Sequence, residues 1–303
     1  MTTFDLDKLP SQKGRIAIVT GANIGLGFET ALGLAQKEMT VILACRNIDK
    51  ATVAKQDILK EVPNADLDII QIDLSKLDAV RSFANNYLEK YQQLDLLINN
   101  AGVMMPPFSL TEDGFELQMA ANYFGHFLLT GLLLQTILAT PNSRIVSLSS
   151  IAHRSGKINF DDLQSKKKYS AMQAYSQSKL ACLIYGYELQ RRLEAAGHTT
   201  TISTIAHPGA SNTNLAQHLP KWAIALFGLL APLFSHSAKA GAQPTLWAAV
   251  GPAEGGDYFG PTKFREMKGK AGKVDSIPLS KDQTIAKKLW EVSEKLTGIT
   301  YSF

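Results

Sequence analysis

The chain has 303 residues, of which 45% are hydrophobic and 19% are charged, and its net charge is +4. This length is enough to bury a sizeable core, and no concentrated basic face with interleaved aromatic residues points to a nucleic-acid partner. The two cysteines and the scattered histidines have no metal-like spacing. Because residues 1–13 also lack the apolar core of a signal peptide, we expect a cytoplasmic protein without a metal site.

Short apolar, β-branched runs alternate with longer amphipathic segments over the first two thirds of the chain. This alternation is typical of an α/β fold of the Rossmann type, a doubly wound parallel sheet with helices on both faces. No change of composition marks a linker, so we expect a single domain. The expected strands are residues 15–20, 40–45, 68–72, 95–99, 144–149 and 200–206, and the expected helices are residues 25–37, 49–61, 77–90, 114–139 and 174–196.

The last third of the chain continues the pattern less clearly. Residues 238–250 and 282–296 have the apolar spacing of helices, and Ser280 is a candidate N-cap for the second. Residues 257–260 predict a short strand that closes the sheet edge. The basic stretch 263–273 predicts a solvated loop, with contact to an anionic membrane surface as the alternative.

Glycines cluster directly after the first expected strand, where the first helix opens. Gly21, Gly25 and Gly27 allow a tight turn and a close approach of the backbone to a pyrophosphate, and the helix amino terminus adds amide donors. Asn23 and Ile24 belong to the same turn. A tight turn that simply needs glycine is the alternative, but placement after the first strand favours a dinucleotide.

The residues after the second strand choose between the two nicotinamide dinucleotides. A carboxylate there would bind the ribose 2′-hydroxyl and repel a 2′-phosphate. This chain instead has Arg46, which can bind a phosphate with two hydrogen bonds, followed by Asn47. An ordinary exposed arginine is the alternative, and we predict NADP(H) as the cofactor.

Further nucleotide contacts are expected after the third and fourth strands. Asp73 and Leu74 lie where an adenine edge would be, although Asp73 could equally cap a helix. The run Asn99-Asn100-Ala101-Gly102 would let the backbone approach the nucleotide, and its two amides could brace neighbouring loops. A plain turn is the alternative there.

Tyr175 and Lys179 are four residues apart, which places a phenol and an ammonium on one face of a helix. A free tyrosine keeps its proton to about pH 10, and a nearby cation stabilises the phenolate. The pair therefore predicts a proton donor and acceptor for alcohol–carbonyl chemistry. Because Tyr-x-x-x-Lys is common by chance, an exposed surface pair is the alternative.

Together these motifs resemble the short-chain dehydrogenase/reductase superfamily over residues 14–260. The closer likeness is to its branch of retinol dehydrogenases and protochlorophyllide reductases. That branch is similar in the long gap between serine and tyrosine, which predicts an inserted loop at 151–172 beside the site, and in the C-terminal extension 261–303. The motifs that carry the resemblance are T-G-A-N-I-G-L-G at 20–27, A-C-R-N at 44–47, N-N-A-G at 99–102, S-S-I-A-H at 149–153, Y-S-Q-S-K at 175–179 and Pro208-Gly209.

The resemblance implies a catalytic tetrad of Asn122, Ser150, Tyr175 and Lys179. Tyr175 would protonate the carbonyl oxygen as hydride arrives from the nicotinamide, and Lys179 would stabilise the phenolate and bind the nicotinamide ribose. Ser150 would donate a hydrogen bond to the same oxygen, with Ser149 as the competing choice. Asn122 would hold a water beside Lys179 or, alternatively, bond its local backbone.

The resemblance also assigns the segment after the sixth strand to the nicotinamide side. Pro208 and Gly209 should pass along it, and Thr213 should bond the carboxamide or a phosphate, or cap a following helix. His207 and His153 are expected to be bonded structural histidines, because Tyr175 already supplies the proton.

An apolar run at 222–234 lies where the family keeps its substrate lid. It is too short to span a bilayer. A helix in the core or at a subunit contact, an apolar wall for a bulky substrate, and a shallow, weak contact with a membrane surface remain alternatives.

Two departures from this branch bear on function. Retinol dehydrogenases often begin with a membrane anchor, which is not visible here, and photoactive protochlorophyllide reductases carry a cysteine where this chain has Ala210. We therefore expect an NADP(H)-dependent oxidoreductase for a lipophilic carbonyl or alcohol, assembled as a dimer or tetramer. The alternatives are a non-catalytic NADP-binding regulator and an NAD-preferring alcohol dehydrogenase.

Overall fold

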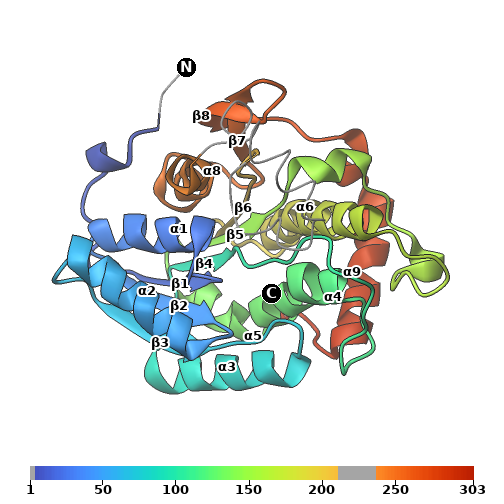
Figure 1. Ribbon diagram of the computed structural model, residues 1–303, viewed down its shortest axis with the longest axis horizontal. Coiled ribbons are helices and arrows are strands. Elements are labelled where there is room, and N and C mark those ends of the chain that lie inside the picture. The colour runs from blue at the N-terminus through green and yellow to red at the C-terminus, as the bar shows by residue number, and fades with distance from the viewer. Residues whose placement is uncertain (1–3, 211–236) are drawn as a thin grey trace.

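One eight-stranded sheet runs through the part of the chain that the computed structural model describes, residues 4–210 and 237–303 (Figure 1). Its strand order is β3-β2-β1-β4-β5-β6-β7-β8. All neighbouring pairs are parallel except β7 and β8. The strands are β1 (Ile16–Thr20), β2 (Thr40–Cys45), β3 (Leu67–Gln71), β4 (Leu96–Asn99), β5 (Arg144–Leu148), β6 (Ile202–Ala206), β7 (Tyr258–Lys263) and β8 (Lys268–Lys273).

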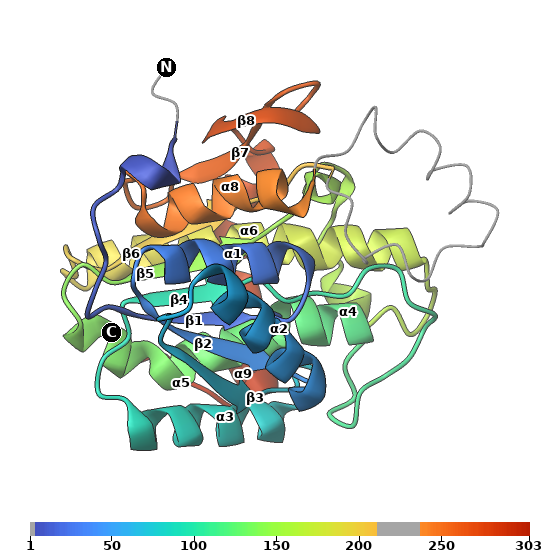
Figure 2. The same cartoon turned by 60° about the vertical axis from the view of Figure 1, so that its left-hand side comes forward.

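Helices cover both faces of this sheet, which confirms the predicted doubly wound architecture (Figure 2). One face packs against α1, α2 and α8, and the other packs against α3, α5, α6 and α9. The helices are α1 (Gly25–Gln36), α2 (Ile48–Glu61), α3 (Leu77–Lys90), α4 (Leu117–Met119), α5 (Gly125–Ala139), α6 (Ala171–Ala195), α8 (Ala238–Val250) and α9 (Gln283–Thr297), with a π-helical turn η2 (Ala120–Phe124) and 3-10 turns η1 (Leu6–Lys8), η3 (Ile151–Ser155), η4 (Phe160–Asp162) and η6 (Pro278–Lys281).

The central strands are apolar along their whole length because both of their faces are buried. In β1 and β2, Ile18 and Ile42 point into the core on the α3–α5 side. Their neighbours Val19 and Leu43 point into the core on the α1–α8 side. Continuous burial explains why short apolar runs, rather than alternating ones, predicted these strands correctly.

The sheet edge differs from the prediction. Residues 263–273 are not a solvated loop, because β8 pairs antiparallel with β7, so β7 does not close the sheet. The sequence of β8 is KGKAGK, which lacks the β-branched residues typical of strands. Lysines are common on edge strands because their charge opposes pairing with another chain. The basic stretch is therefore a protected edge.

The start of α9 also differs from the prediction. Its N-cap is Asp282, whose carboxylate accepts the backbone N–H groups of Thr284 and Ile285 at 2.8 and 3.0 Å. Ser280 lies in the preceding turn η6, where its hydroxyl donates to the carbonyl of Ile277. Both residue types are good caps, and the position of η6 decides between them.

An aromatic cluster packs α9 against α5 and α6. Trp290 is almost fully buried, with its ring 5.2 Å from Phe127, 5.8 Å from Tyr185 and 4.6 Å from Tyr301 between centroids. The Arg192 guanidinium lies 4.2 Å above the Trp290 ring. The C-terminal extension is thus part of the main core.

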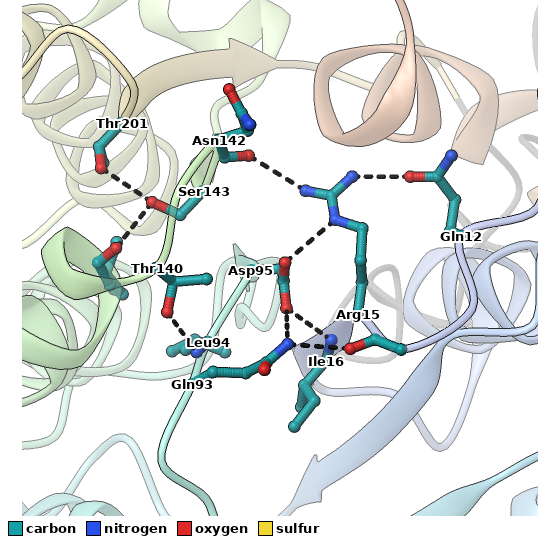
Figure 3. Close-up of polar contacts among 12 residues, drawn as sticks. Gln12, Arg15, Ile16, Gln93, Leu94, Asp95, Thr140, Asn142, Ser143 and Thr201 are labelled. Atoms are coloured by element: carbon teal, nitrogen blue, oxygen red, sulfur yellow. Dashed lines mark hydrogen bonds and ion pairs between the residues drawn. The ribbon is translucent and has the colours of Figure 1, made fainter.

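A polar network joins the strands at their amino ends, the edge of the sheet opposite the glycine turn (Figure 3). Asp95 accepts hydrogen bonds from the Arg15 side chain at 3.1 Å and from the backbone N–H of Ile16 at 2.8 Å. Arg15 also reaches the carbonyl of Asn142. This network fixes the chain where it enters β1 and β5.

A second buried network joins the carboxyl ends of β1 and β4 to α5. The backbone N–H groups of Asn100 and Ala101 donate to the Thr20 hydroxyl at 2.9 and 3.0 Å. His126 Nδ1 donates to the carbonyl of Asn122 at 3.0 Å, so its Nε2, 2.9 Å from the Thr20 hydroxyl, is the acceptor. Burial lowers the pKa of His126 to about 4, which keeps the ring neutral at pH 7.

Replacing Trp290 with alanine should lower the free energy of unfolding by about 3–5 kcal/mol, because it leaves a cavity among the rings of Phe127, Tyr185, Tyr301 and Phe303. Chemical denaturation of the Trp290→Ala protein measures this loss. Val53→Ala on α2, where Val53 is 56% exposed, is the control and should change stability by no more than about 0.5 kcal/mol. Equal effects of the two substitutions would contradict the assigned core.

Stability should fall as the pH drops from about 6.5 to about 4, because His126 stays neutral when folded and takes up a proton when unfolded. A shift of this size corresponds to about 3 kcal/mol. The His126→Gln protein should be less stable at pH 7, since it loses two hydrogen bonds, and its stability should depend less on pH. Denaturation at several pH values tests this, and parallel pH curves would refute it.

Candidate active site

The predicted site residues gather at the carboxyl ends of β1, β2, β4, β5 and β6. These strands are neighbours in the sheet, and a parallel sheet brings the loops after them to one edge, the usual place for a ligand in this architecture. The loops in question contain the glycine turn, Arg46, the run 99–102, Ser150 and the Pro208-Gly209 pair.

The glycine turn is shaped for a close backbone approach. Gly21 and Gly25 have φ angles of +68° and +59°, in the left-handed region that favours glycine. A Cβ atom on Gly27 would lie 2.2 Å from the carbonyl oxygen of Gly21, so no larger residue fits there. Ile24 is 51% exposed and provides no side-chain cap for α1, so the first amides of α1 are available to an anion. Asn23 is half-buried in this turn, and the turn fits a pyrophosphate.

Arg46 follows β2 beside the glycine turn, as predicted. Its side chain is exposed, and it forms no ion pair with any residue in the described ranges. Asn47 is the N-cap of α2, and its side chain accepts the N–H of Lys50 at 2.8 Å. Among the described residues, the Arg46 side chain is therefore an unpaired donor beside the glycine turn. Asn47 instead caps the first turn of α2.

In the loop after β3 a side chain bonds within its own loop, whereas in the loop after β4 a side chain bonds the neighbouring glycine turn. Asp73 is not a helix N-cap, because α3 begins after Lys76, and its carboxylate instead accepts from Ser75. Leu74 next to it is buried. Asn100 donates to the carbonyl of Thr20 at 2.7 Å, which confirms that an amide of this run braces the neighbouring turn.

Tyr175 and Lys179 lie one turn apart on α6, and both are buried, at 5% and 6% exposure. The surface-pair interpretation is therefore wrong. The Lys179 ammonium donates to the carbonyl of Leu148 at the end of β5, at 3.1 Å. A Cβ atom on Gly102 would lie 3.4 Å from Lys179 Nζ and 3.0 Å from Asn122 Oδ1. These contacts place the ammonium beside the loop after β4.

Asn122 lies in the π-helical turn η2 between α4 and α5. Its side chain bonds both backbone groups of Val103, accepting the N–H at 2.7 Å and donating to the carbonyl at 3.0 Å, and also donates to Ser178. Its own carbonyl accepts from His126 and from the Cys182 thiol. π-Helical turns often mark functional sites, and here the turn joins the loop after β4 to α6.

The two serines after β5 have different environments. Ser149 is buried and its hydroxyl donates to the carbonyl of Lys179 at 2.8 Å. Ser150 is half-buried and begins η3, where its hydroxyl accepts the N–H of Ala152. Ser149 thus supports α6, and Ser150 is the more exposed of the two serines. The expected loop over 151–172 contains η3 and η4 and the start of α6.

Pro208 and Gly209 follow β6, and both are half-buried. Gly209 has a φ angle of +71° and packs tightly against the turn between β7 and β8. His207 is fully buried, and the Gly209 N–H donates to its Nδ1 at 3.2 Å, which agrees with a bonded structural histidine. Thr213 and the apolar run 222–234 lie outside the described residues.

Several residues that shape this edge were not predicted from the sequence. Thr20 and His126 connect the glycine turn to Asn122, and Gln118 binds the strained backbone of Met105. Only His126 had a usable signal, since it lies four residues after Asn122 on the same helical face. Within the described ranges, no group of three or more potential ligands could hold a metal ion.

The chain matches the family model of the short chain dehydrogenases over residues 15–224. Retinol dehydrogenase 13 from Homo sapiens is 41% identical to it over 291 residues, which cover 94% of this chain and 85% of that protein. A protein of known structure from Mycobacterium Paratuberculosis is 39% identical, with a TM-score of 0.83 and full coverage of both chains.

A Shigella flexneri protein solved in complex with NADP shares the fold at 23% identity, with a TM-score of 0.61 over 78% of this chain and 92% of that chain. The matched family model spans the glycine turn, the run after β4, the serines after β5 and the Tyr175–Lys179 pair on α6. The chain belongs to the short chain dehydrogenase family.

Proposed function

We propose that this protein is an NADP(H)-dependent oxidoreductase that interconverts a carbonyl compound and an alcohol, with a lipophilic substrate. The observation that carries this proposal is the burial of Tyr175 and Lys179 one turn apart on α6, with the ammonium held beside the loop after β4. A phenol is a suitable acid and base for alcohol–carbonyl chemistry, and an ammonium on the same helix face supplies the positive charge that stabilises a phenolate.

Each residue at this edge has a role in the proposed reaction. NADPH would supply the hydride. Tyr175 donates the proton to the substrate oxygen, and the Lys179 ammonium stabilises the phenolate that remains. Ser150 donates a hydrogen bond to the same oxygen, where negative charge develops. In the oxidation direction Tyr175 accepts the proton instead.

Asn122 would connect this site to a proton relay. A small cavity beside it is lined by Asn99, His126, Ser147 and Cys182, among others. Asn99 Oδ1 and Ser147 Oγ have no hydrogen-bond partner among the described residues. Two unpaired oxygens suit an ordered water, which would continue the relay from Asn122.

The preference for NADP(H) rests on Arg46. Its guanidinium is exposed beside the glycine turn, where a 2′-phosphate would lie. No carboxylate occupies the end of β2, and guanidinium groups bind phosphate with two parallel hydrogen bonds. The Shigella flexneri protein with the same fold binds NADP. An NAD-preferring alcohol dehydrogenase is the alternative.

The proposal of a lipophilic substrate rests on the rim of the site and on the relatives. Met172 lies one turn before Tyr175 on α6 and is 50% exposed, and Phe108 and Leu110 are more than 40% exposed on the loop after β4. Phe108 packs on Tyr169, whose hydroxyl donates to the carbonyl of Pro106. Similar proteins include retinol dehydrogenases 13 and 12 from Homo sapiens.

We also propose that the protein works in a reducing compartment such as the cytoplasm, because Cys45 and Cys182 are buried free thiols. Burial raises the pKa of Cys45 to about 11, so it remains protonated. No helix within the described ranges has the length and apolar character to cross a membrane. Assembly into a dimer or tetramer stays a prediction.

Replacing Tyr175 with phenylalanine should lower kcat by at least roughly 100-fold, because the proton donor is lost while the ring is kept. NADPH binding, followed by nicotinamide fluorescence, should change by less than about threefold. Retinal, a panel of other aldehydes and ketones, and NADPH absorbance provide the activity assay. Near-normal turnover by Tyr175→Phe would refute the mechanism, and an inactive wild type would favour a non-catalytic NADP-binding protein.

Replacing Arg46 with alanine should weaken NADPH binding by roughly 10- to 100-fold, because two charge-assisted hydrogen bonds to the 2′-phosphate are lost. NADH, which has no such phosphate, should bind Arg46→Ala as it binds the wild type. Arg46→Lys keeps the charge but cannot form the two parallel hydrogen bonds. Its affinity for NADPH should therefore lie between those of the wild type and Arg46→Ala. An equal loss for NADPH and NADH would refute the phosphate contact.

A further inference from the structure

Glu266 joins two loops of the candidate site from outside it. It lies in the turn between β7 and β8. One carboxylate oxygen accepts from Arg154 at 2.7 Å, and the other lies 3.3 Å from Nε2 of His207. Arg154 belongs to η3, the turn that Ser150 begins, and His207 directly precedes Pro208. One side chain therefore contacts the serine loop and the loop after β6 together.

The His207 ring transmits this contact to Gly209. Its Nδ1 accepts the Gly209 N–H at 3.2 Å, so in the neutral ring the proton is on Nε2, the atom that faces Glu266. The ring is fully buried, and burial lowers its pKa although Glu266 opposes this. Glu266 thus lies against the N–H edge of a neutral imidazole, and the imidazole holds the backbone of Gly209.

The turn that contains Glu266 also packs directly against the loop after β6. The Ala210 N–H donates to the carbonyl of Met267 at 2.9 Å. A Cβ atom on Gly209 would lie 2.6 Å from that carbonyl and 2.7 Å from the Pro261 ring. The position of the turn therefore decides the position of Pro208-Gly209.

At its other end the contact reaches the backbone of Ser150 through η3. His153 donates to the carbonyl of Ser150 from both its backbone N–H, at 3.0 Å, and its ring Nδ1, at 2.7 Å. Arg154, the next residue, binds Glu266 and also donates to the carbonyl of Asp275 at 3.1 Å. A displacement of the Arg154 side chain would therefore shift the backbone of Ser150.

The backbone of this turn is strained. Phe264, Arg265 and Glu266 have φ angles of +52°, +54° and +65°, three successive non-glycine residues in the left-handed region. Such conformations cost free energy and persist where the surrounding contacts impose them, often beside functional sites. The contacts of Glu266 with Arg154 and His207 are contacts of this kind.

We propose that Glu266 is a positioning residue of the reaction, which fixes the Ser150 loop and the Pro208-Gly209 loop in one mutual geometry. The proposal rests on the proposed function, in which Ser150 binds the substrate oxygen and Pro208-Gly209 passes along the nicotinamide. Glu266 touches neither substrate nor cofactor in this scheme. It acts through Arg154 and His207, so its loss should misplace the reacting groups without removing any of them.

Three variants test the proposal with the full-length protein. Glu266→Ala removes both contacts, and Glu266→Gln keeps the length of the side chain but not its charge. Lys273→Met is the matched control, because it breaks an ion pair of the same hairpin, Lys273 with Asp257 at 2.8 Å, which contacts neither loop. Each variant is compared with wild type for thermal unfolding, for kcat and KM with the carbonyl compound that wild type reduces fastest, and for binding of NADPH and of 2′,5′-ADP.

Glu266→Ala should lower kcat by roughly 10- to 100-fold, the effect of misplacing reacting groups by about 1 Å, while KM for the carbonyl compound stays nearly unchanged. Glu266→Gln should be less affected, and Lys273→Met should match wild type. NADPH binding should weaken in Glu266→Ala, whereas binding of 2′,5′-ADP, which lacks the nicotinamide, should not. The unfolding temperatures of Glu266→Gln and Lys273→Met should be similar.

Two results would overturn the proposal. One is a kcat of Glu266→Ala and Glu266→Gln close to that of wild type. The other is an equal loss of NADPH and 2′,5′-ADP binding together with a lowered unfolding temperature in both variants, which would show a purely structural role. If wild type reduces no carbonyl compound, the proposed function fails, and the comparison of NADPH with 2′,5′-ADP still decides the role of Glu266.

Discussion

The hydroxyl of Thr20 is the interaction on which the geometry of the site depends. It accepts hydrogen bonds from two backbone amides of the loop after β4 and donates one to His126, which in turn donates to the carbonyl of Asn122. One hydroxyl therefore relates the glycine turn, the loop after β4 and the π-helical turn to one another. In a buried region each of these groups needs its partner, so the arrangement tolerates little movement.

The side chains of the candidate site are held by backbone groups of the sheet and its loops. Lys179 binds the carbonyl of Leu148, Asn122 pairs with both backbone groups of Val103, and Ser149 supports α6 through the carbonyl of Lys179. Groups held in this way take their positions from rigid elements, as the proposed proton transfer requires. Away from the site, Asp95 at the amino ends of the strands and the aromatic cluster around Trp290 also contribute to stability.

The C-terminal extension contributes both to the core and to the candidate site. Through α9 it completes the core beside α5 and α6, and through the hairpin of β7 and β8 it reaches the loop after β6. The proposed role of Glu266 follows from this second contact. An extension that is remote in sequence from Ser150 thus lies against the turn that Ser150 begins, because β7 continues the sheet beside β6.

The doubly wound sheet, the glycine turn, the position of Arg46 and the Tyr175–Lys179 pair could all be predicted from the order of the residues. Each of these is recorded locally, as buried runs, as glycines at fixed places or as spacing along one helix. Tertiary structure alone decided that β8 forms the edge, that Asp282 rather than Ser280 caps α9, that Asn122 pairs with Val103, and that Glu266 meets His207 and Arg154. These features depend on backbone groups and on side chains far apart in the chain, which come together only when the sheet is assembled.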